Sequence, residues 1–433
     1  MGSHSTATNN KDILLIGAGP GNFALAQILR KHDIPFQIFE RDEKIDPRRQ
    51  GWSFALIEAL QELPPLISDD LGDIHMTSVN HSIGVNKDTM TIVQAMSGQV
   101  MLFWAIVSLA NQDISSGVGK IFSRYDEDAD GVTAFFTDGT SARGSILVGG
   151  DGLRSKVREQ LLVGYTEPDA AKLEPSQWIP IFGQCELSQE RFEAIHDFSS
   201  AGILAAGPTI RYGRLEAKVY HLADKTKMIG PKEIQPDRSY ASYYWAGAYA
   251  SQGKSHSEWA AEAEWVSNAS KQQLFNKSKE LTKNFAPFLT KIIDYTGVGG
   301  MLTHPPRFIE YVSPKQLPRG RVTLLGDAVH TMIPFRGQGA NTAIRDACDL
   351  GRLLIKAGGV PQAPEDLLQE YASIILPRGR EMVLSSRASG QQIQGVLAAT
   401  EGRVDTFVGA RSPPSGAPLA GAHDGEPTGK TEA

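Results

Sequence analysis

The sequence predicts an α/β protein in which a Rossmann-like domain, built on a parallel β-sheet, carries an inserted, mainly antiparallel domain. Two observations predict this class. Residues 11–40 read as strand, glycine turn, helix and strand, a βαβ unit of the size expected for a parallel crossover. Residues 166–295 are instead rich in aromatic and turn-forming residues, which is typical of antiparallel strands. The length of 433 residues suits such a multidomain chain.

On this basis we divide the chain into three parts. The Rossmann-like domain is discontinuous and takes residues 11–75, 100–165 and 300–400. The inserted domain takes residues 76–99 and 166–299, and a C-terminal tail takes 401–433. The tail is rich in Pro, Gly, Ala, Ser and Thr, a composition that buries little apolar surface and predicts disorder.

The composition excludes several classes of protein. Hydrophobic residues make up 41% and charged residues 21% of the chain, as in ordinary globular proteins. The formal net charge of −6 argues against a nucleic-acid binder, which usually carries a basic face. The two cysteines, Cys185 and Cys348, lie far apart, so neither a disulfide scaffold nor a metal site is expected, and a reducing compartment such as the cytoplasm is favoured.

No stable membrane span is expected. Residues 1–10 lack the basic start and apolar core of a signal peptide. Residues Thr89 to Gln112 carry no charge, but their strongly apolar part, Val100 to Ala110, is too short for a span and favours a buried helix. Loose membrane contact stays open, and the sequence indicates no oligomeric state.

The first βαβ unit contains a dinucleotide-binding turn. The apolar run Ile13 to Ile16 is typical of a strand covered on both faces. It leads into the glycine turn Gly17-Ala18-Gly19-Pro20-Gly21-Asn22. The first glycine permits the turn, the second lets the backbone approach a pyrophosphate, and the helix N-terminus attracts the anion. Asn22 replaces the third glycine of the GxGxxG pattern, so either the helix sits farther out or Gly21 shares the packing role.

An acidic residue completes this motif. Pro35 ends the helical pattern, and Phe36 to Phe39 form the next strand. Glu40 ends that strand, about 20 residues beyond the glycine turn, where a carboxylate accepts hydrogen bonds from a ribose and repels a 2′-phosphate. Strand, turn, helix and acid in this order predict a dinucleotide site.

Further strands and a helix are expected later in the chain. We expect Val132 to Thr137, the turn Asp138-Gly139, and Ser145 to Val148 to form a strand, a tight turn and a second strand. We also expect a short buried strand over 321–325 and a helix from Gly339 to Ile355, with apolar residues on one face.

Three motifs then stand in order along the chain. The first is Gly149-Gly150-Asp151-Gly152, continuing to Arg158, and the second is Gly326-Asp327-Ala328-Val329-His330. The third runs from Pro334 to Asn341. Singly, each would be an ordinary turn. Together they resemble the single-component FAD-dependent monooxygenases of the aromatic-hydroxylase, para-hydroxybenzoate hydroxylase-like type, over 11–51, 132–158 and 319–350.

The resemblance implies an FAD-binding role for the Rossmann-like domain and assigns its residues. Pyrophosphate contacts fall to Gly17, Gly19 and Gly21, the adenosine ribose to Glu40, and a further cofactor contact to Arg41. Asp151 and Gly152 would brace the site and relate to nicotinamide use. Asp327 would bind the ribityl chain, and the loop beside the isoalloxazine would contain Pro334, Gly337, Gly339 and Asn341.

No catalytic residue follows with certainty. The candidates include Arg48 and Arg49, because in similar proteins an arginine of this region reaches the flavin or substrate. Pro334, in the third motif, is also a candidate. Arg154 and Arg158 are either solvated, or Arg158 anchors the loop after Gly150. His330 receives no proton-transfer role. One departure is that residues 88–119 contain no Lys or Arg, although the family usually places a flavin-contacting arginine there.

The implied reaction uses FAD, NADPH or NADH, and O2. A flavin C4a-hydroperoxide would transfer one oxygen atom to a hydrophobic aromatic or polycyclic small molecule, within secondary metabolism. Hydroxylation, epoxidation and Baeyer–Villiger chemistry are not separable by sequence. The pocket would lie between the flavin and the inserted domain, with candidate walls at Trp52, Tyr243, Trp245 and Phe335.

Two alternatives stay open. Trp178-Ile179-Pro180 is similar to the end of the WxWxIP signature of flavin-dependent halogenases, but no residue separates its tryptophan from Ile-Pro, and Ser176 stands at the first tryptophan position. The altered Asn22 and the missing arginine instead favour a non-catalytic flavin- or ligand-binding protein.

Overall fold

The structure is a computed structural model of the chain. It describes residues 11–43, 58–68, 80–86, 91–97, 117–165, 172–188, 202–206, 212–220, 240–250, 255–283 and 287–399. The expected helix over 100–110 and the C-terminal tail lie outside these residues. Among the helices that the structure describes, none combines the length and the apolar character needed to cross a bilayer.

A four-stranded parallel sheet forms the first layer. Its strand order is β15 (Val322–Leu324), β8 (Ile146–Gly149), β1 (Ile13–Ile16) and β2 (Phe36–Phe39). Every residue of β1, β8 and β15 is buried, which explains why these strands are apolar at almost every position. The predicted βαβ unit is therefore confirmed, with helix α1 (Pro20–Lys31) as its crossover.

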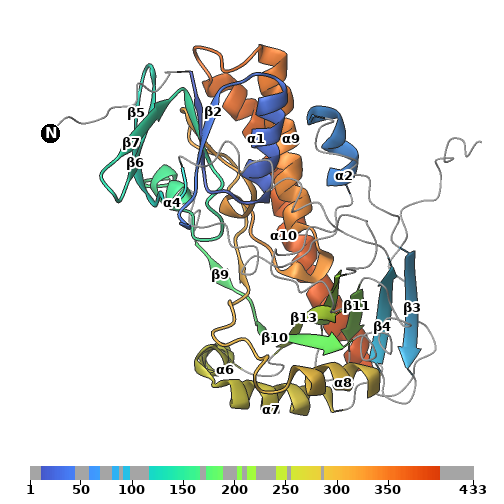
Figure 1. Ribbon diagram of the computed structural model, residues 1–433. Coiled ribbons are helices and arrows are strands. Elements are labelled where there is room, and N and C mark those ends of the chain that lie inside the picture. Colours follow the sequence, from blue (N-terminus) through green and yellow to red (C-terminus); the bar gives the residue numbers. More distant parts are fainter. Residues whose placement is uncertain are drawn as a thin grey trace, which may run out of the picture.

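Two helices pack together beside this sheet (Figure 1). They are α1 and α9 (Gly339–Ala357), the second of which confirms the predicted helix. Their axes approach closely because α9 presents Gly351 to Ile28: a Cβ at Gly351 would lie 2.7 Å from the Ile28 side chain. The short α2 (Ala59–Glu62), η1 (Pro64–Leu66) and α4 (Lys156–Leu161) are further helical elements of this half.

The predicted hairpin has a different second strand. Three antiparallel strands, β5 (Phe122–Asp128), β6 (Gly131–Phe136) and β7 (Ser141–Gly144), form a separate sheet. The turn at Asp138-Gly139 is as expected, but β6 pairs with β7 and not with residues 145–148, most of which belong to β8 of the parallel sheet. The burial patterns give the reason: β7 is partly exposed, whereas β8 is buried throughout and suits only a position covered on both faces.

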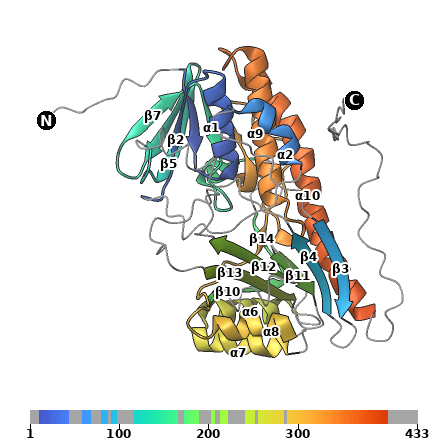
Figure 2. The same ribbon diagram turned by 45° about the vertical axis from the view of Figure 1, so that its right-hand side comes forward.

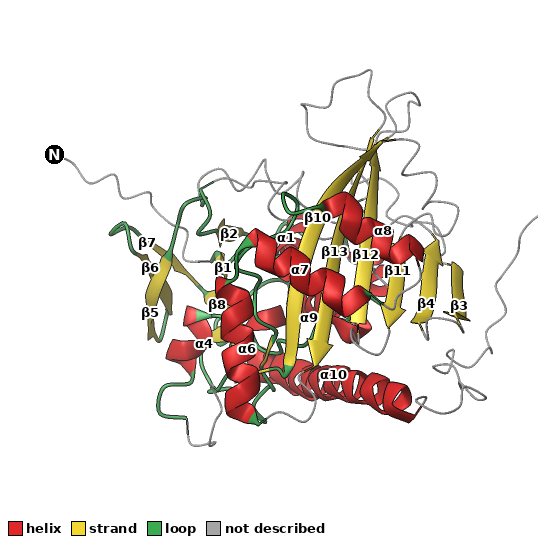
Figure 3. Ribbon diagram, turned by 90° about the horizontal axis from the view of Figure 1, so that it is seen from below, coloured by secondary structure: helices red, strands yellow, loops and turns green. Residues whose placement is uncertain are grey.

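A six-stranded antiparallel sheet forms the second half of the molecule, as the fold class predicts. Its order is β10 (Trp178–Ser188), β13 (Tyr240–Ala250), β12 (Tyr212–Tyr220), β11 (Gly202–Ala206), β4 (Thr91–Ser97) and β3 (Asn80–Asn86). Figure 3 shows the strands side by side in this order. Since β3 and β4 join strands from the later segment, their pairing supports placing 76–99 in the inserted domain, and the domain boundaries stay a proposal.

Three helices cover one face of this antiparallel sheet (Figure 2). They are α6 (His256–Asn268), α7 (Lys271–Thr282) and α8 (Pro287–Thr296). Ser255 and Ser270 each form a capping box at the start of α6 and α7, which explains where these helices begin. A core of Ile179, Ile181, Trp245 and their neighbours fills the space between sheet and helices.

The long helix α10 (Glu365–Ala399) connects the two halves (Figures 1 and 2). Near the parallel sheet, the buried Tyr371 hydroxyl donates to the Leu324 carbonyl of β15 at 3.3 Å. Farther along, Arg387 donates to Glu310 and Glu174, 3.1 Å each, in the two-stranded sheet of β14 (Ile309–Glu310) and β9 (Glu174–Pro175). One helix thus contacts both the parallel sheet and the two-stranded sheet.

Candidate active site

The glycine turn between β1 and α1 is tightly confined. Gly17 has φ +90°, in the left-handed region, and a Cβ there would lie 2.6 Å from the Gly150 carbonyl oxygen. Gly21 faces α9 and the end of β15. A Cβ at Gly21 would overlap the Leu325 side chain and lie 3.0 Å from the Ala343 carbonyl oxygen of α9. Gly21 therefore provides the close packing that the third glycine of the motif usually provides, so the second of the two expected alternatives holds.

Asn22 has a bracing role in the position of that third glycine. Its buried side-chain amide donates to the carbonyls of Ile16 at 3.0 Å and Gly17 at 2.8 Å. The side chain also packs against Gly150, where a Cβ would lie 2.5 Å from Asn22 Nδ2. Asn22 therefore braces the end of β1 by hydrogen bonds and packs against the turn after β8.

The start of α1 is open to an anion. Gly19 is its N-cap and has no side-chain capping bond, so the first N–H groups of the helix keep their capacity to bind a ligand. A Cβ on Gly19 would meet only the Gly150 carbonyl oxygen, at 3.8 Å, so the fold itself does not require glycine there. This combination points to a ligand that approaches the backbone at Gly19.

Glu40 lies beside this turn. One carboxylate oxygen accepts from the Ala18 N–H at 2.7 Å, and the other accepts from the Asp42 N–H at 3.0 Å. The neighbouring Arg41 side chain is exposed, 3.9 Å from the Asp42 carboxylate. Glu40 is thus held in the place that the motif predicts, and the cofactor-binding roles of Glu40 and Arg41 stay predictions.

The motif after β8 is a braced loop. Asp151 accepts from the Ser155 hydroxyl at 2.5 Å and from the Lys156 N–H at 2.7 Å, so its carboxylate stabilises the start of α4. Burial raises the pKa of Asp151, against these hydrogen bonds, which lower it. Gly152 adopts φ +80°, a conformation that a side chain would disfavour.

Arg158 joins this loop to the motif after β15. Its guanidinium is buried, donates to the Leu153 carbonyl at 2.7 Å and to the Ala328 carbonyl at 3.0 Å, and lies 4.4 Å from the Tyr311 ring centroid. Arg154, four residues earlier, is exposed. Of the two alternatives for this arginine pair, the anchoring role of Arg158 is the one that the contacts support.

The turn after β15, η3 (Gly326–Ala328), presents Asp327. Gly326 has φ +64°, and the Thr331 hydroxyl donates to the Asp327 carbonyl at 2.6 Å. The Asp327 side chain is exposed, and no hydrogen bond reaches its carboxylate from the part of the chain that the structure describes. The surrounding protein raises the pKa of Asp327, against the nearby charges of His330 and Arg158, which lower it. An exposed carboxylate that accepts no hydrogen bond from the described residues can accept hydrogen bonds from a polyhydroxyl ligand.

His330 ends this turn and is fully buried. Its Nε2 lies 2.5 Å from the Asp346 carboxylate on α9, which also accepts from Arg378 of α10 at 2.8 Å. Burial lowers the pKa of His330, but the charge and hydrogen bond of Asp346, together with the Asp327 charge, make the net shift upward. For Asp346, burial raises the pKa, and the His330 and Arg378 charges bring it below the usual range. Both shifts favour the ionised form of the pair, and the contacts described for His330 include none that indicates proton transfer.

The third motif forms a loop that leads into α9. Pro334 begins η4 (Pro334–Arg336), Gly337 adopts φ +62°, and Gly339 starts the helix without a side-chain cap. Asn341 is buried and donates to the Gly337 carbonyl at 3.2 Å, which holds the loop against the helix. These contacts shape the loop, and the isoalloxazine roles of its residues stay predictions.

Trp245, one of the candidate pocket walls, packs in a core. Trp245 is buried on the helix-covered side of the antiparallel sheet, and its indole N–H donates to Thr296 of α8 at 2.9 Å. Odd-numbered residues of β13 near this point face the helices, so Trp245 contributes to the core between sheet and helices. Tyr243 lies opposite Cys185 in the β10–β13 pairing. The candidates Trp52, Arg48 and Arg49 lie outside the described residues.

Replacing Trp245 with phenylalanine tests this assignment. We expect the free energy of unfolding to fall by about 1 to 2 kcal/mol, because the buried Thr296 hydroxyl loses its donor and some packing is lost. Flavin content and substrate KM should not change. Urea denaturation measures the stability, and steady-state kinetics measures the KM. A changed KM with unchanged stability would show that Trp245 lines the substrate pocket.

Phe335 contacts the second sheet. Its ring meets Trp178 of β10 edge-on, with centroids 4.5 Å apart. The two rings pack with Ile333 and Ala248 on the face of the sheet opposite to the helices, and Gly390 of α10 leaves room for them. Sequence reasoning considered Trp178 only for its halogenase-like signature, and the structure places it beside the candidate flavin loop.

Comparison with known proteins agrees with this geometry. A family model described as an FAD binding domain matches residues 311–386, which contain the turn after β15 and the loop into α9. An FAD-dependent monooxygenase of Trichoderma harzianum, thnD, is 32% identical over 400 residues, covering 87% of this chain and 92% of that protein. The chain belongs to the FAD-dependent monooxygenases. The resemblance found in the sequence, the enzyme class and FAD as cofactor are thereby confirmed.

Other members of this monooxygenase family extend the comparison. Penicillium herquei phnB, also an FAD-dependent monooxygenase, is 25% identical, covering 88% of this chain and 90% of its own. Among solved structures, Klebsiella pneumoniae HpxO complexed with FAD and uric acid has a TM-score of 0.63 at 19% identity, covering 90% and 93% of the two chains. A salicylate hydroxylase substrate complex has a TM-score of 0.61 at 17% identity, with the same coverage. These structures confirm the fold class.

Proposed function

We propose that this monooxygenase binds FAD across the carboxyl ends of its parallel strands. One observation carries the proposal: the glycine turn, Glu40, Asp151 and Asp327 follow β1, β2, β8 and β15, which are neighbours in one parallel sheet. The carboxyl ends of parallel strands meet at the same edge, where ligands bind in open α/β folds. Motifs far apart in the sequence therefore converge on one edge.

The residues present fit the cofactor. The uncapped start of α1 beside Gly19 would hold the pyrophosphate, and Glu40 would hold the adenosine ribose. Asp327, exposed and without a described partner, would accept hydrogen bonds from the ribityl hydroxyls. The loop Pro334–Gly337 and the start of α9 would border the isoalloxazine ring.

Bound FAD would supply the redox chemistry, taking electrons from NADPH or NADH and activating O2 at its C4a carbon for transfer of one oxygen atom to the substrate. The residues of this chain would position the cofactor and shield it from water. Arg158 holds two of the cofactor loops together, and the N-terminus of α9 offers a partial positive charge to developing negative charge. Phe335 and its neighbours on the sheet exclude water from one side.

We infer that the substrate is a hydrophobic aromatic or polycyclic small molecule of secondary metabolism. The partly exposed Phe335 ring, which packs on the buried Trp178 and Ile333, supports this class because it offers an apolar ring beside the proposed flavin loop. Structural relatives support it as well, since they include a salicylate hydroxylase, a 2,6-dihydroxypyridine-3-hydroxylase and a protein complexed with uric acid, all named for ring compounds.

The test of this substrate class is NAD(P)H oxidation with a panel of such ring compounds under ¹⁸O2. Product that carries one labelled oxygen atom supports the proposal. Product that forms only when chloride or bromide is present supports a halogenase instead. An absence of turnover in FAD-loaded protein across the whole panel supports a binding protein.

Replacing Asp327 with alanine tests the cofactor site. We expect the affinity for FAD to fall about tenfold or more, because a charge-assisted hydrogen-bond acceptor is lost. The stability of the FAD-free protein should change by less than about 0.5 kcal/mol, since this side chain is exposed. The released chromophore is quantified from the visible spectrum, and FAD binding is titrated by fluorescence. The control is Glu370→Gln on the exposed side of α10, and unchanged affinity in Asp327→Ala would remove Asp327 from the site.

A further inference from the structure

We propose that Asp346 is a positioning residue that holds both ends of the turn carrying Asp327. This inference rests on the proposed FAD site and names the group that shapes it. One oxygen of the Asp346 carboxylate accepts from the Gly326 N–H at 3.1 Å, at the start of the turn. The same oxygen lies 2.5 Å from Nε2 of His330, at the end of the turn. Asp327 stands between these two attachment points.

The turn itself is closed by short hydrogen bonds. The N–H groups of Val329 and His330 donate to the Gly326 carbonyl at 2.8 and 3.0 Å. The Thr331 hydroxyl donates to the Asp327 carbonyl at 2.6 Å. The backbone at Asp327 is therefore held from within, and the Asp346 carboxylate fixes the whole turn relative to α9.

A fully buried carboxylate is stable only if it is well paired, and α10 provides the partner. Arg378 donates to the second oxygen of Asp346 at 2.8 Å and also lies 2.6 Å from Asp349. Gly379, the next residue, lets α10 lie against the histidine, because a Cβ there would be 2.6 Å from His330 Cδ2. Both oxygens of the Asp346 carboxylate are therefore paired, one with the turn and the other with α10.

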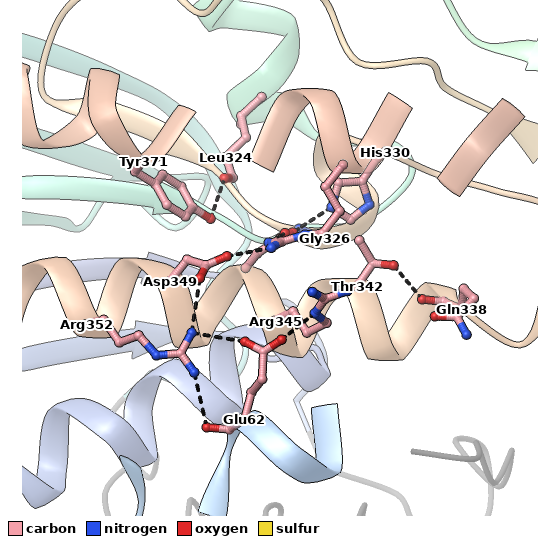
Figure 4. Close-up of polar contacts among 12 residues, drawn as sticks. Glu62, Leu324, Gly326, His330, Gln338, Thr342, Arg345, Asp349, Arg352 and Tyr371 are labelled. Atoms are coloured by element: carbon pink, nitrogen blue, oxygen red, sulfur yellow. Dashed lines mark hydrogen bonds and ion pairs between the residues drawn. The ribbon is translucent and has the colours of Figure 1, made fainter. Parts of the chain in front are cut away.

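A row of ion pairs with alternating charges runs from Arg378 toward the surface. Figure 4 shows Asp349, Arg352 and Glu62 in succession, with distances of 3.1 Å from Arg352 to Asp349 and 3.0 Å to Glu62. Asp349 lies one helical turn from Asp346 on α9 and shares Arg378 with it. The ion pairs described for the Asp349 side chain are with Arg352 and Arg378, and none is with the turn. Asp349 therefore provides a matched control for the loss of a carboxylate beside Arg378.

The test compares FAD-free Asp346→Asn and Asp349→Asn proteins by thermal unfolding and by FAD titration. We expect both substitutions to lower the melting temperature, because each removes a charge paired with Arg378. Only Asp346→Asn should weaken FAD binding, by about tenfold or more, as for the loss of a charge-assisted hydrogen bond. Equal FAD affinity of the two variants would overturn the proposal.

A double-mutant cycle with Asp327→Ala separates positioning from general damage. If Asp346 acts through Asp327, the double variant binds FAD as weakly as Asp327→Ala alone, whereas additive losses would overturn the proposal. Should Asp346→Asn not fold, His330→Leu replaces it in the cycle, since it releases the far end of the turn and leaves Asp346 paired with Arg378. If Asp327→Ala itself leaves FAD binding unchanged, the cofactor assignment fails and this inference fails with it. A loss in Asp327→Ala without a loss in Asp346→Asn overturns the inference alone.

Discussion

Replacing Gly17 with alanine is expected to lower the free energy of unfolding by about 3 to 5 kcal/mol and to abolish FAD retention. The backbone at Gly17 has φ +90°, which side chains disfavour. The new Cβ would also lie 2.6 Å from the Gly150 carbonyl oxygen and 2.8 Å from the Asp151 Cα. Both atoms belong to the backbone after β8, so relief requires separating two neighbouring strands of the parallel sheet.

Gly19→Ala is the matched control for that prediction. Gly19 has φ −77°, and a methyl group added there would have its nearest contact 3.8 Å away, so the FAD-free protein should lose less than about 0.5 kcal/mol. FAD affinity should still fall by about tenfold or more, because the methyl group takes space at the predicted pyrophosphate position. Urea denaturation of the FAD-free proteins and FAD titration separate the two effects. Equal stability of the two variants would contradict the role assigned to Gly17.

Replacing Arg158 with methionine is expected to cost about 3 kcal/mol of stability and most of the FAD affinity. The substitution leaves the carbonyls of Leu153 and Ala328 without their buried donor and removes the charge above the Tyr311 ring. Because these carbonyls belong to two different loops of the proposed cofactor site, the loops lose their common anchor.

Two further variants test this explanation. Arg158→Lys should recover little, since an ammonium group lacks the planar fork that reaches both carbonyls. Arg154→Met removes an exposed arginine from the same loop and should change stability by less than about 0.5 kcal/mol. Chemical denaturation and FAD titration give the comparison. A full recovery in Arg158→Lys would show that charge alone, and not the double hydrogen bond, accounts for the role of Arg158.

Local patterns were sufficient wherever neighbouring residues determine the structure. The apolar run Ile13 to Ile16, the glycine turn and the acid at Glu40 predicted β1, α1 and β2, because a βαβ unit is specified within one short segment. The same holds for α9, whose apolar spacing defines its buried face. Asp346 falls on that face, and a lone charge in a buried stripe is the sequence signal that could have singled it out.

The pairing of strands from distant segments could not be predicted from local sequence patterns. The predicted hairpin joined β6 to residues 145–148, since a partly exposed strand and an apolar strand both follow the turn at Gly139 within a few residues. Only the neighbours decide which strand pairs: β8 lies between β1 and β15, which come from opposite ends of the chain. For Trp245, aromatic character predicted a pocket wall, and the side of the sheet that α8 covers made it a core residue.

The sequence by itself determined the parallel-sheet fold, the order of the cofactor motifs and the enzyme family, because each is encoded in short, contiguous patterns. Tertiary structure alone decided how the motifs are held together. Arg158 reaches Ala328 across 170 positions, and Asp346 joins the Asp327 turn to α10 through Arg378. Such contacts depend on burial and on distances between separate elements, and a buried charge shows its partner only when the chain is folded.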